Sequence, residues 1–383
     1  MKEYPLVSLG TLISQAKKVR CGEEDYPVLS MTMHNGLIFQ DKKFKKVIAS
    51  QDRSNYKVVY RNQLVISFPI DEGVLAAQRI TDAGIVSPAY GIWDIDQEKI
   101  LPEFLECALR CERALNYYKS KLRGSTARRR SLPTSTLLAF NVPLPSISEQ
   151  LNVLAIVHKL KSVIDTRKEE INVLDKLVKA RFVEMFGTLH DNENGFDIVT
   201  IEDVCSLIKD GTHQTPQYTE DKKEGYKFLS SKDVMSQKVD WTNIKYIPAE
   251  LHEKLYATIK PQRNDILMSK NGVNYGVAAV NDTDEVFDIY VSLALLRPKK
   301  IIDPVFLKCV INNPETKWQF DSSIKGIGVP NLHLGEIKKT RMFLPPIELQ
   351  NQFADFVRAI DKSKVSLYYK NRKGGFSAII VYI

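Results

Sequence analysis

The chain has 383 residues, 44% of them hydrophobic and 26% charged, with a formal net charge of +8. This composition excludes a disordered chain and predicts two or three domains that each bury a core. No apolar run approaches membrane-spanning length and no charged stretch precedes an apolar one at the N-terminus, so we expect a cytoplasmic protein without a signal peptide.

Cysteine and histidine usage bears on metal and redox chemistry. Five cysteines without a CxxC pair argue against a disulfide framework or a zinc ribbon, and six histidines without metal-ligand spacing argue against a zinc centre. Cys107 and Cys309 stand beside equivalent apolar pairs, so we expect both to be small buried apolar side chains.

The first part of the chain reads as short strands followed by a helix. β-like runs lie at 27–32 and 64–68 between turn-forming residues, and a helical stretch covers 103–121. The basic loop GSTARRRS at 124–131 follows, in a chain whose pI is about 9.0. The basic loop could simply be a solvated surface loop. The lysines and arginines around it favour instead a loop that contacts phosphate groups. The residues concerned are Arg128, Arg129 and Arg130.

A long helix follows the phrase PLPSISEQ. Ser148 is its expected N-cap, with Glu149 and Gln150 in the first turn, and no Gly or Pro interrupts the chain until Gly187. Apolar residues recur in alternating steps of four and three, which is typical of a coiled-coil seam. The seam consists of Val153, Val157, Leu160, Ile164, Ile171, Leu174, Val178 and Met185. Such a helix is roughly 60 Å long and needs a partner to bury its seam.

The second part of the chain repeats the first. β-like runs at 227–231, 265–269 and 291–296 and a helical stretch at 303–320 precede a second phrase, LPPIELQ at 344–350. Matching pairs include VSLG at 7–10 with VTIE at 199–202, RNQLVIS at 61–67 with RNDILMS at 263–269, and LPEFLEC at 101–107 with IDPVFLKC at 302–309. The chain therefore reads as a tandem duplication.

The second long helix differs from the first. Its seam begins with Phe353, Val357 and Ile360 and then degrades, so we expect a shorter helix that ends before Gly374. The last segment, FSAIIVYI at 376–383, reads equally well as a terminal strand or as an altered C-terminus.

These motifs resemble the specificity subunit of type I restriction–modification systems over essentially the whole chain. The resemblance rests on the two LPxI phrases, on KDGTHQTPQY at 209–218, on GYKFLSSKDV at 225–234, and on GSTARRRS with its counterpart GIGVPNL at 326–332. It implies an α+β fold with two tandem target-recognition domains of mixed β-structure, joined by long antiparallel coiled-coil helices in a pseudo-twofold repeat. The implied division is 1–146 and 188–346 for the recognition domains, and 147–187 and 347–383 for the two helices.

The resemblance also implies a function. Such a chain reads a split double-stranded DNA target and directs methyltransferase and restriction subunits to it, without catalysis of its own. S-adenosylmethionine, ATP and magnesium are expected on those partners, and no cofactor or metal on this chain.

Two polar loops supply candidate base-reading residues. Side chains in the grooves read base identity, and glutamine suits adenine. The candidates are Thr212, His213 and Gln214 after Gly211, and Ser269, Lys270 and Asn271 after a β-like run. Turn formation is the alternative role for both loops.

Other classes of protein fit less well. DPVF at 303–306 lacks the second proline of an amino-methyltransferase phrase, and Asp210 with 220–222 imitates a nuclease motif in a turn-rich loop. A truncated or orphan specificity chain, acting only as a DNA-binding or homodimeric module, stays open as the alternative.

Overall fold

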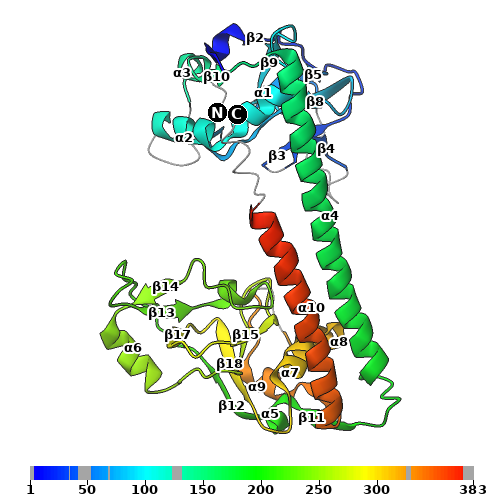
Figure 1. Cartoon of the computed structure of the whole chain (residues 1–383), viewed down its shortest axis with the longest axis vertical. Helices are drawn as coiled ribbons and strands as arrows, with labels where there is room; N and C mark the ends of the chain where they lie inside the picture. Colours follow the sequence, from blue (N-terminus) through cyan, green and yellow to red (C-terminus); the bar gives the residue numbers. More distant parts are fainter. Residues whose placement is uncertain are drawn as a thin grey trace. The chain divides into compact units, whose positions relative to one another are not determined.

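The computed structural model describes residues 4–33, 35–41, 53–67, 70–122, 132–324 and 329–373, with backbone alone from residue 366 on. The chain divides into two compact units: the first unit is Met1–Lys168 with Tyr368–Ile383, and the second unit is Glu169–Leu367. Both units combine helices with short strands, and helix α4, Ile147–Phe186, is the long one (Figure 1). The expected α+β class with two sheet-rich domains and a long helix is confirmed.

The first unit is built around a four-stranded antiparallel sheet in the order β2-β9-β6-β7. Helix α1 packs against β7, and its apolar face, with Phe104 and Leu105 fully buried, covers this sheet. Smaller two-stranded pairs are β1-β10, β3-β4 and β5-β8. The elements are β1 Leu6–Ser8, η1 Leu9–Thr11, β2 Ile13–Gln15, β3 Leu29–Thr32, β4 Gly36–Phe39, β5 Lys57–Tyr60, β6 Leu64–Ile66, η2 Ile70–Glu72, β7 Leu75–Ala77, β8 Ala83–Val86, β9 Gly91–Ile95, α1 Pro102–Arg110, α2 Glu112–Lys121, α3 Thr134–Leu138 and β10 Asn141–Pro143.

The second unit repeats this plan in the same chain order. Its main sheet is β12-β18-β15-β16, the pair β11-β19 corresponds to β1-β10, and β13 lies in a three-stranded sheet β14-β13-β17. The elements are β11 Asp197–Thr200, α5 Ile201–Val204, β12 Cys205–Asp210, β13 Tyr226–Leu229, η4 Ser231–Val234, β14 Lys245–Ile247, α6 Ala249–Tyr256, β15 Ile266–Ser269, β16 Ala278–Val280, β17 Phe287–Ile289, β18 Leu293–Pro298, α7 Pro304–Ile311, α8 Pro314–Ser323, α9 Leu334–Lys339, β19 Arg341–Leu344 and α10 Ile347–Lys373. All five β-like runs named from the sequence contain strands, so those predictions are confirmed.

Each predicted helical stretch is two helices rather than one. Between α1 and α2, Cys111 has an extended backbone. Between α7 and α8, Asn313 caps the second helix by accepting a hydrogen bond from Glu315 N, with Pro314 in the first turn. A cap and a proline start a new helix, which the apolar pattern alone did not reveal.

The two cysteines at matching places in α1 and α7 are less buried than expected. Cys107 and Cys309 are both half-buried. Burial nevertheless raises the pKa of each thiol to about 11, so both stay neutral near pH 7.

The first LPxI phrase ends in a buried glutamine that ties the start of α4 to the chain ahead of α1. Gln150 has no exposed surface. Its Nε2 donates to Pro145 O at 2.9 Å and to Lys99 O at 3.0 Å, and its Oε1 accepts from Leu101 N at 2.8 Å. One side chain thus satisfies three backbone groups.

The second phrase does the same in the second unit. Gln350, also without exposed surface, donates to Pro345 O at 2.8 Å and Ile301 O at 3.2 Å and accepts from Asp303 N at 2.9 Å. The phrase therefore occurs twice because each repeat needs the same clamp between its closing helix and its α1 or α7 segment.

The N-terminus of α4 differs in detail from the prediction. The helix begins at Ile147, so Ser148 lies in its first turn and is not the cap. Ser146 takes that place, and the Glu149 carboxylate accepts hydrogen bonds from both Ser146 N and Ser146 Oγ. The proline before Ser146 permits an extended entry, which moves the cap two residues earlier than Ser148.

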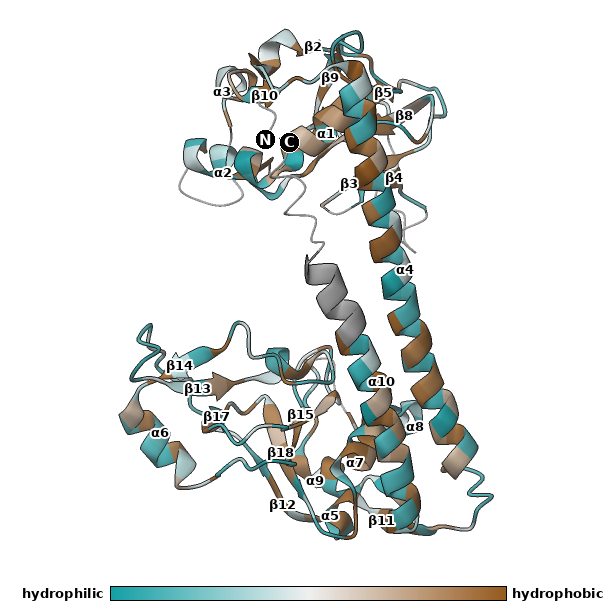
Figure 2. Ribbon diagram, in the orientation of Figure 1, coloured by the Kyte–Doolittle hydropathy of each residue, from teal (hydrophilic) through white to brown (hydrophobic). Residues whose placement is uncertain are grey.

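Helix α4 shows the predicted seam. Its seam positions are half-buried, with Val157 buried, whereas most intervening residues are exposed. Apolar and hydrophilic residues interleave along the helix in Figure 2. The seam rule missed Phe182 and Phe186, which are 5% and 0% exposed and belong to the core of the second unit.

Within the second unit, α10 runs antiparallel to the C-terminal half of α4. The rings of Phe353 and Phe182 lie 5.5 Å apart, while Lys364, further along α10, pairs with Asp175, further back along α4. Val357 is buried and Ile360 half-buried on the same face. Lys364 thus adds an ion pair where the apolar seam degrades. Lys373 is the last residue of α10 that the structure describes, so the predicted end before Gly374 stays a prediction, and the tail 376–383 lies outside the described residues.

Candidate nucleic-acid interface

Three loops of the second unit meet at one edge of its main sheet. Strands β12 and β15 both pair antiparallel with β18, so they run in the same direction and end opposite the start of β18. The residues that follow Asp210 and Ser269 therefore emerge side by side. The segment 329–332 joins them, since Gly272 N donates to Pro330 O at 3.0 Å and Leu332 N donates to Lys270 O at 2.8 Å. We call this arrangement, 210–214 with 269–274 and 329–332, the loop edge.

A charged cluster ties the loops together. The Asp210 carboxylate accepts a hydrogen bond from Lys270 Nζ at 2.8 Å and lies 3.2 Å from His213 Nε2. Burial opposes the charged form of Asp210, but the hydrogen bond and charge of Lys270, with His213, lower its pKa below the ordinary value. Asp210 therefore stays ionised at neutral pH and neutralises the buried Lys270.

Three of the predicted readers stand at the open side of this edge. Thr212 is partly exposed and forms a parallel bridge with Tyr290, and its Oγ1 accepts from Gln214 N at 3.3 Å. The His213 side chain is 72% exposed, and Gln214 is exposed. Gly211 sets their position because a Cβ there would lie 2.1 Å from Ile289 O.

The other three predicted residues are less accessible. Ser269 has no exposed surface, and its Oγ donates to Asn274 O and accepts from Val277 N. Lys270 is 4% exposed and paired with Asp210. The Asn271 Oδ1 is buried without a hydrogen-bond partner among the described residues. Ser269 and Lys270 thus fix the backbone of the loop edge through buried hydrogen bonds and an ion pair. Asn271 Oδ1 is a hydrogen-bond acceptor without a partner among the described residues.

Two valines at the loop edge were not singled out from the sequence. Val273 is 87% and Val329 79% exposed. Gly272 has a φ of +87°, which turns the loop so that Val273 projects. Only the turn-forming neighbours hinted at these positions, because exposed apolar residues have no periodic signal.

The first unit has an equivalent edge that is only partly described. Strands β2 and β6 both pair antiparallel with β9, so their ends also meet. Lys17 and Lys18 follow β2 and are exposed, a basic pair that the sequence reasoning passed over. Arg128, Arg129 and Arg130 lie outside the described residues.

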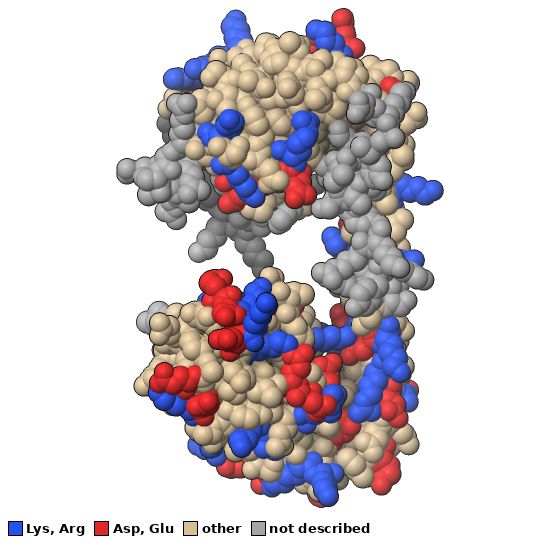
Figure 3. Space-filling model, turned by 60° about the vertical axis from the view of Figure 1, so that its left-hand side comes forward, with Lys and Arg blue, Asp and Glu red and all other residues tan. Residues whose placement is uncertain are grey.

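Charge on the second unit is mixed. Acidic and basic side chains stand next to one another on the face drawn in Figure 3. Among the described residues, no group of three His, Cys, Asp or Glu side chains is placed to hold a metal ion, and no helix is long and apolar enough to cross a membrane. Lys17 and Lys18 of the first unit are a local pair of exposed basic groups.

Comparison with known proteins follows this geometry. Residues 193–372, which include the loop edge, match the type I restriction modification DNA specificity domain. The chain is 22% identical over 238 residues to the type I restriction enzyme MjaVIII specificity subunit of Methanocaldococcus jannaschii, covering 57% of this chain and 55% of that protein. It is 24% identical over 266 residues to the EcoBI specificity subunit of Escherichia coli, covering 62% and 56%. The matches thus span little more than half of these relatives.

Two solved structures match the chain along nearly its whole length. The type I S subunit from M. genitalium is 12% identical with a TM-score of 0.49, over 99% of this chain and 94% of that one. The HsdS subunit from Thermoanaerobacter tengcongensis is 17% identical with a TM-score of 0.40, over 98% and 95%. Residues 193–372 thus match a specificity domain of type I restriction–modification systems, and the chain is similar to specificity subunits of such systems.

Proposed function

We propose that this chain reads DNA sequence for a type I restriction–modification enzyme, with each sheet-rich unit recognising one half of a split target. The observation that carries the proposal is the loop edge, where three polar loops of the matched specificity domain meet. A DNA-reading surface needs polar side chains that are exposed and held in a fixed register, and the loop edge supplies both.

In this proposal, some residues of the loop edge contact bases and others hold the loops in position. Gln214 has an exposed amide suited to bidentate contact with adenine, and His213 and Thr212 offer further donors and acceptors. Asp210 and Lys270 hold the loops in register, since their charges cancel within the protein. In the first unit, Lys17 and Lys18 with the three arginines at 128–130 contact the phosphate backbone.

The proposal also assigns the remaining parts. Residues 1–146 and 188–346 act as target-recognition domains, and 147–187 and 347–383 contain the helices that link them and receive the methyltransferase subunits. Restriction subunits join through that complex in the cytoplasm. The chain performs no chemistry itself, and S-adenosylmethionine, ATP and magnesium belong to the partners.

The test is a methylome. The chain is expressed with its methyltransferase subunit in a methylation-free host, and methylated adenines are mapped by single-molecule sequencing. A split motif with two short specific halves and a fixed gap supports the proposal. A soluble, co-purifying complex that binds DNA but methylates none contradicts it and favours an orphan or homodimeric binding module.

A further inference from the structure

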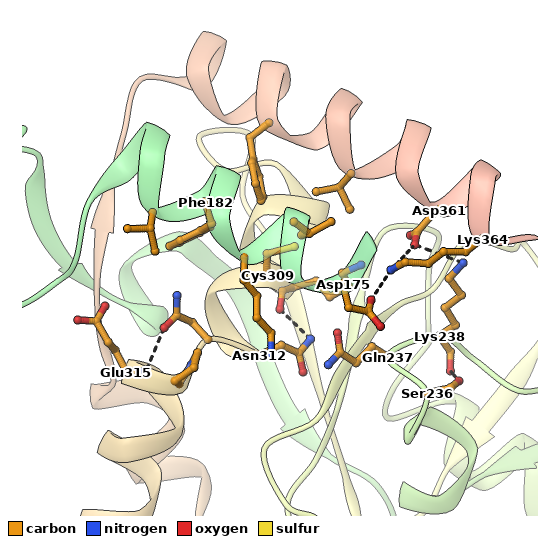
Figure 4. Close-up of a pocket in the computed structure, with 18 of the residues that line it drawn as sticks. Asp175, Phe182, Ser236, Gln237, Lys238, Cys309, Asn312, Glu315, Asp361 and Lys364 are labelled. Atoms are coloured by element: carbon orange, nitrogen blue, oxygen red, sulfur yellow. Dashed lines mark hydrogen bonds and ion pairs between the residues drawn. The ribbon is translucent and has the colours of Figure 1, made fainter. Parts of the chain in front are cut away.

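A cavity of about 570 Å³ lies within the second unit, away from the loop edge. Its walls are the C-terminal half of α4, the loop 235–238, the junction of α7 with α8, and α10 (Figure 4). The apolar part of the wall comes mainly from Ile171, Val178, Phe182, Cys309, Phe353 and Val357. This size and lining are those of a small-molecule site.

Most charged groups around the cavity already have partners. Lys364 pairs with Asp175 and lies 3.6 Å from Asp361, which also lies 3.5 Å from Lys238. Glu315 accepts a hydrogen bond from Leu189 N at 2.9 Å. The two lysines and two aspartates form one ion-pair cluster on the side of the cavity opposite Glu315 (Figure 4), and Glu315 has no ion pair with any described residue.

Lys308 is a nearly buried exception. It lines the cavity, is only 9% exposed, and has no ion pair or side-chain hydrogen bond with any residue that the structure describes. A nearly buried ammonium without a counter-charge is unfavourable unless an anion or water reaches it. The cavity is the open route by which an anion can do so.

In the first unit, the residue at the matching place has a structural role that Lys308 does not share. The matching residue of α1, Glu106, accepts a hydrogen bond from Ala77 N at 3.0 Å and pairs with Arg110 at 3.1 Å. In the second unit Asn312 makes the corresponding bond to the sheet, accepting from Ala278 N at 3.0 Å. Lys308 therefore does not supply the hydrogen bond that links helix α7 to the sheet.

The neighbouring thiol contributes an apolar surface. Because burial raises the pKa of Cys309 to about 11, it stays protonated near neutral pH and does not compete with a ligand as an anion. Of the two lysines of this wall that pair with no described residue, Lys179 is exposed and Lys308 is nearly buried.

We propose that this cavity binds a small organic monoanion with an aromatic or branched apolar body, whose carboxylate or sulfonate pairs with Lys308. The ligand touches both α4 and α10, so its binding stabilises the packing of these two helices in the second unit. This site is separate from the DNA-reading role and does not depend on it.

The experiment uses two matched probes, 2-naphthoate and 2-naphthalenemethanol, titrated calorimetrically into the full chain. They share an apolar body and differ in charge. We expect the carboxylate to bind at least tenfold more tightly than the alcohol. Lys308→Met should abolish that difference, whereas Lys179→Met, which removes an exposed lysine of the same wall, should keep it.

Two further variants keep the result decisive. Lys308→Arg retains the charge and should retain the preference for the anion, and Val178→Trp fills the cavity and should weaken both probes. Equal binding of the two probes to the unaltered chain, or an unchanged preference in Lys308→Met, overturns the proposal. Circular dichroism on each variant confirms that the fold is intact.

Discussion

The two sheet-rich units repeat one plan of strands and helices, and they differ in the side chains at some matching positions. Gln150 and Gln350 make the same three backbone hydrogen bonds in their own units. Glu106 and Lys308 also stand at matching places, yet Glu106 is bonded to a strand and Lys308 faces a cavity. The comparison teaches that the repeats are alike where a side chain fixes the backbone and differ where it faces an edge or a cavity.

The largest expected effect follows from removing the glutamine hydrogen bonds that both units share. Gln350→Ala should lower the free energy of unfolding by about 2–4 kcal/mol, because it leaves buried backbone groups at Asp303 and Pro345 unpaired. Gln150→Ala should cost a similar amount in the first unit. Urea unfolding measures both, with the exposed Gln352→Ala as the control. A large loss from only one of the two would break the equivalence of the phrases.

The next effect concerns the Asp210–Lys270 ion pair at the loop edge of the second unit. Asp210→Asn should cost about 1–3 kcal/mol at pH 7, because it leaves the buried Lys270 ammonium without its carboxylate. Since folding lowers the Asp210 pKa below its ordinary 3.8, the stabilisation is complete above that value and lost as pH falls through the folded pKa.

The unaltered chain and Asp210→Asn should therefore differ at pH 7 and converge as the pH falls through the folded pKa of Asp210, which lies below 3.8. Denaturant titrations at pH 7 and in acid check this. The exposed Asp82→Asn, in a solvent-facing pair with Arg61, serves as the control and should change stability little. A difference that persists unchanged in acid would contradict the role given to the carboxylate.

A smaller effect concerns specificity. Gln214→Ala should weaken recognition at one position by about 1–3 kcal/mol and relax only one half of the methylated motif. Methylome sequencing with the partner subunit reads both halves at once. Loss of specificity in both halves, or an unchanged motif, would argue against Gln214 as a base reader, and Gln352→Ala again supplies the control.

The smallest effect belongs to the first unit. Lys17→Ala and Lys18→Ala should each weaken binding to every DNA sequence alike and reduce the slope of log affinity against log salt by about 1. Alanine at Arg128, Arg129 and Arg130 together should flatten it further. Fluorescence anisotropy across a salt series measures these slopes. A sequence-dependent loss would show that these residues read bases instead.

The sequence was most informative where a pattern repeats. The long helix α4 and its seam followed from apolar spacing, and the paired phrases revealed the duplication, because both signals extend over many residues. Single-residue geometry was harder to predict. The cap at Ser146 and the breaks at Cys111 and Asn313 depend on a few backbone angles that periodicity does not encode.

The candidate site divides in the same way. Polar residues after Gly211 and before Gly272 predicted that 212–214 and 269–271 lie in loops. The structure places both at one edge of the sheet, with Ser269 as the last residue of β15. It also separates the exposed Gln214 from the buried Ser269, which no sequence rule distinguished. Lys17, Lys18 and Val273 had too little pattern around them to stand out.

By itself, the sequence determined the duplication and the long helix, which rest on local composition and spacing, and its motifs carried the family resemblance that implied the α+β class. Only the tertiary structure decided that Asp210 meets Lys270, that both glutamines clamp their helices, and that Lys308 lines a cavity without pairing to any described residue. Those facts depend on contacts between residues far apart in the chain, and such contacts form only when strands and helices pack.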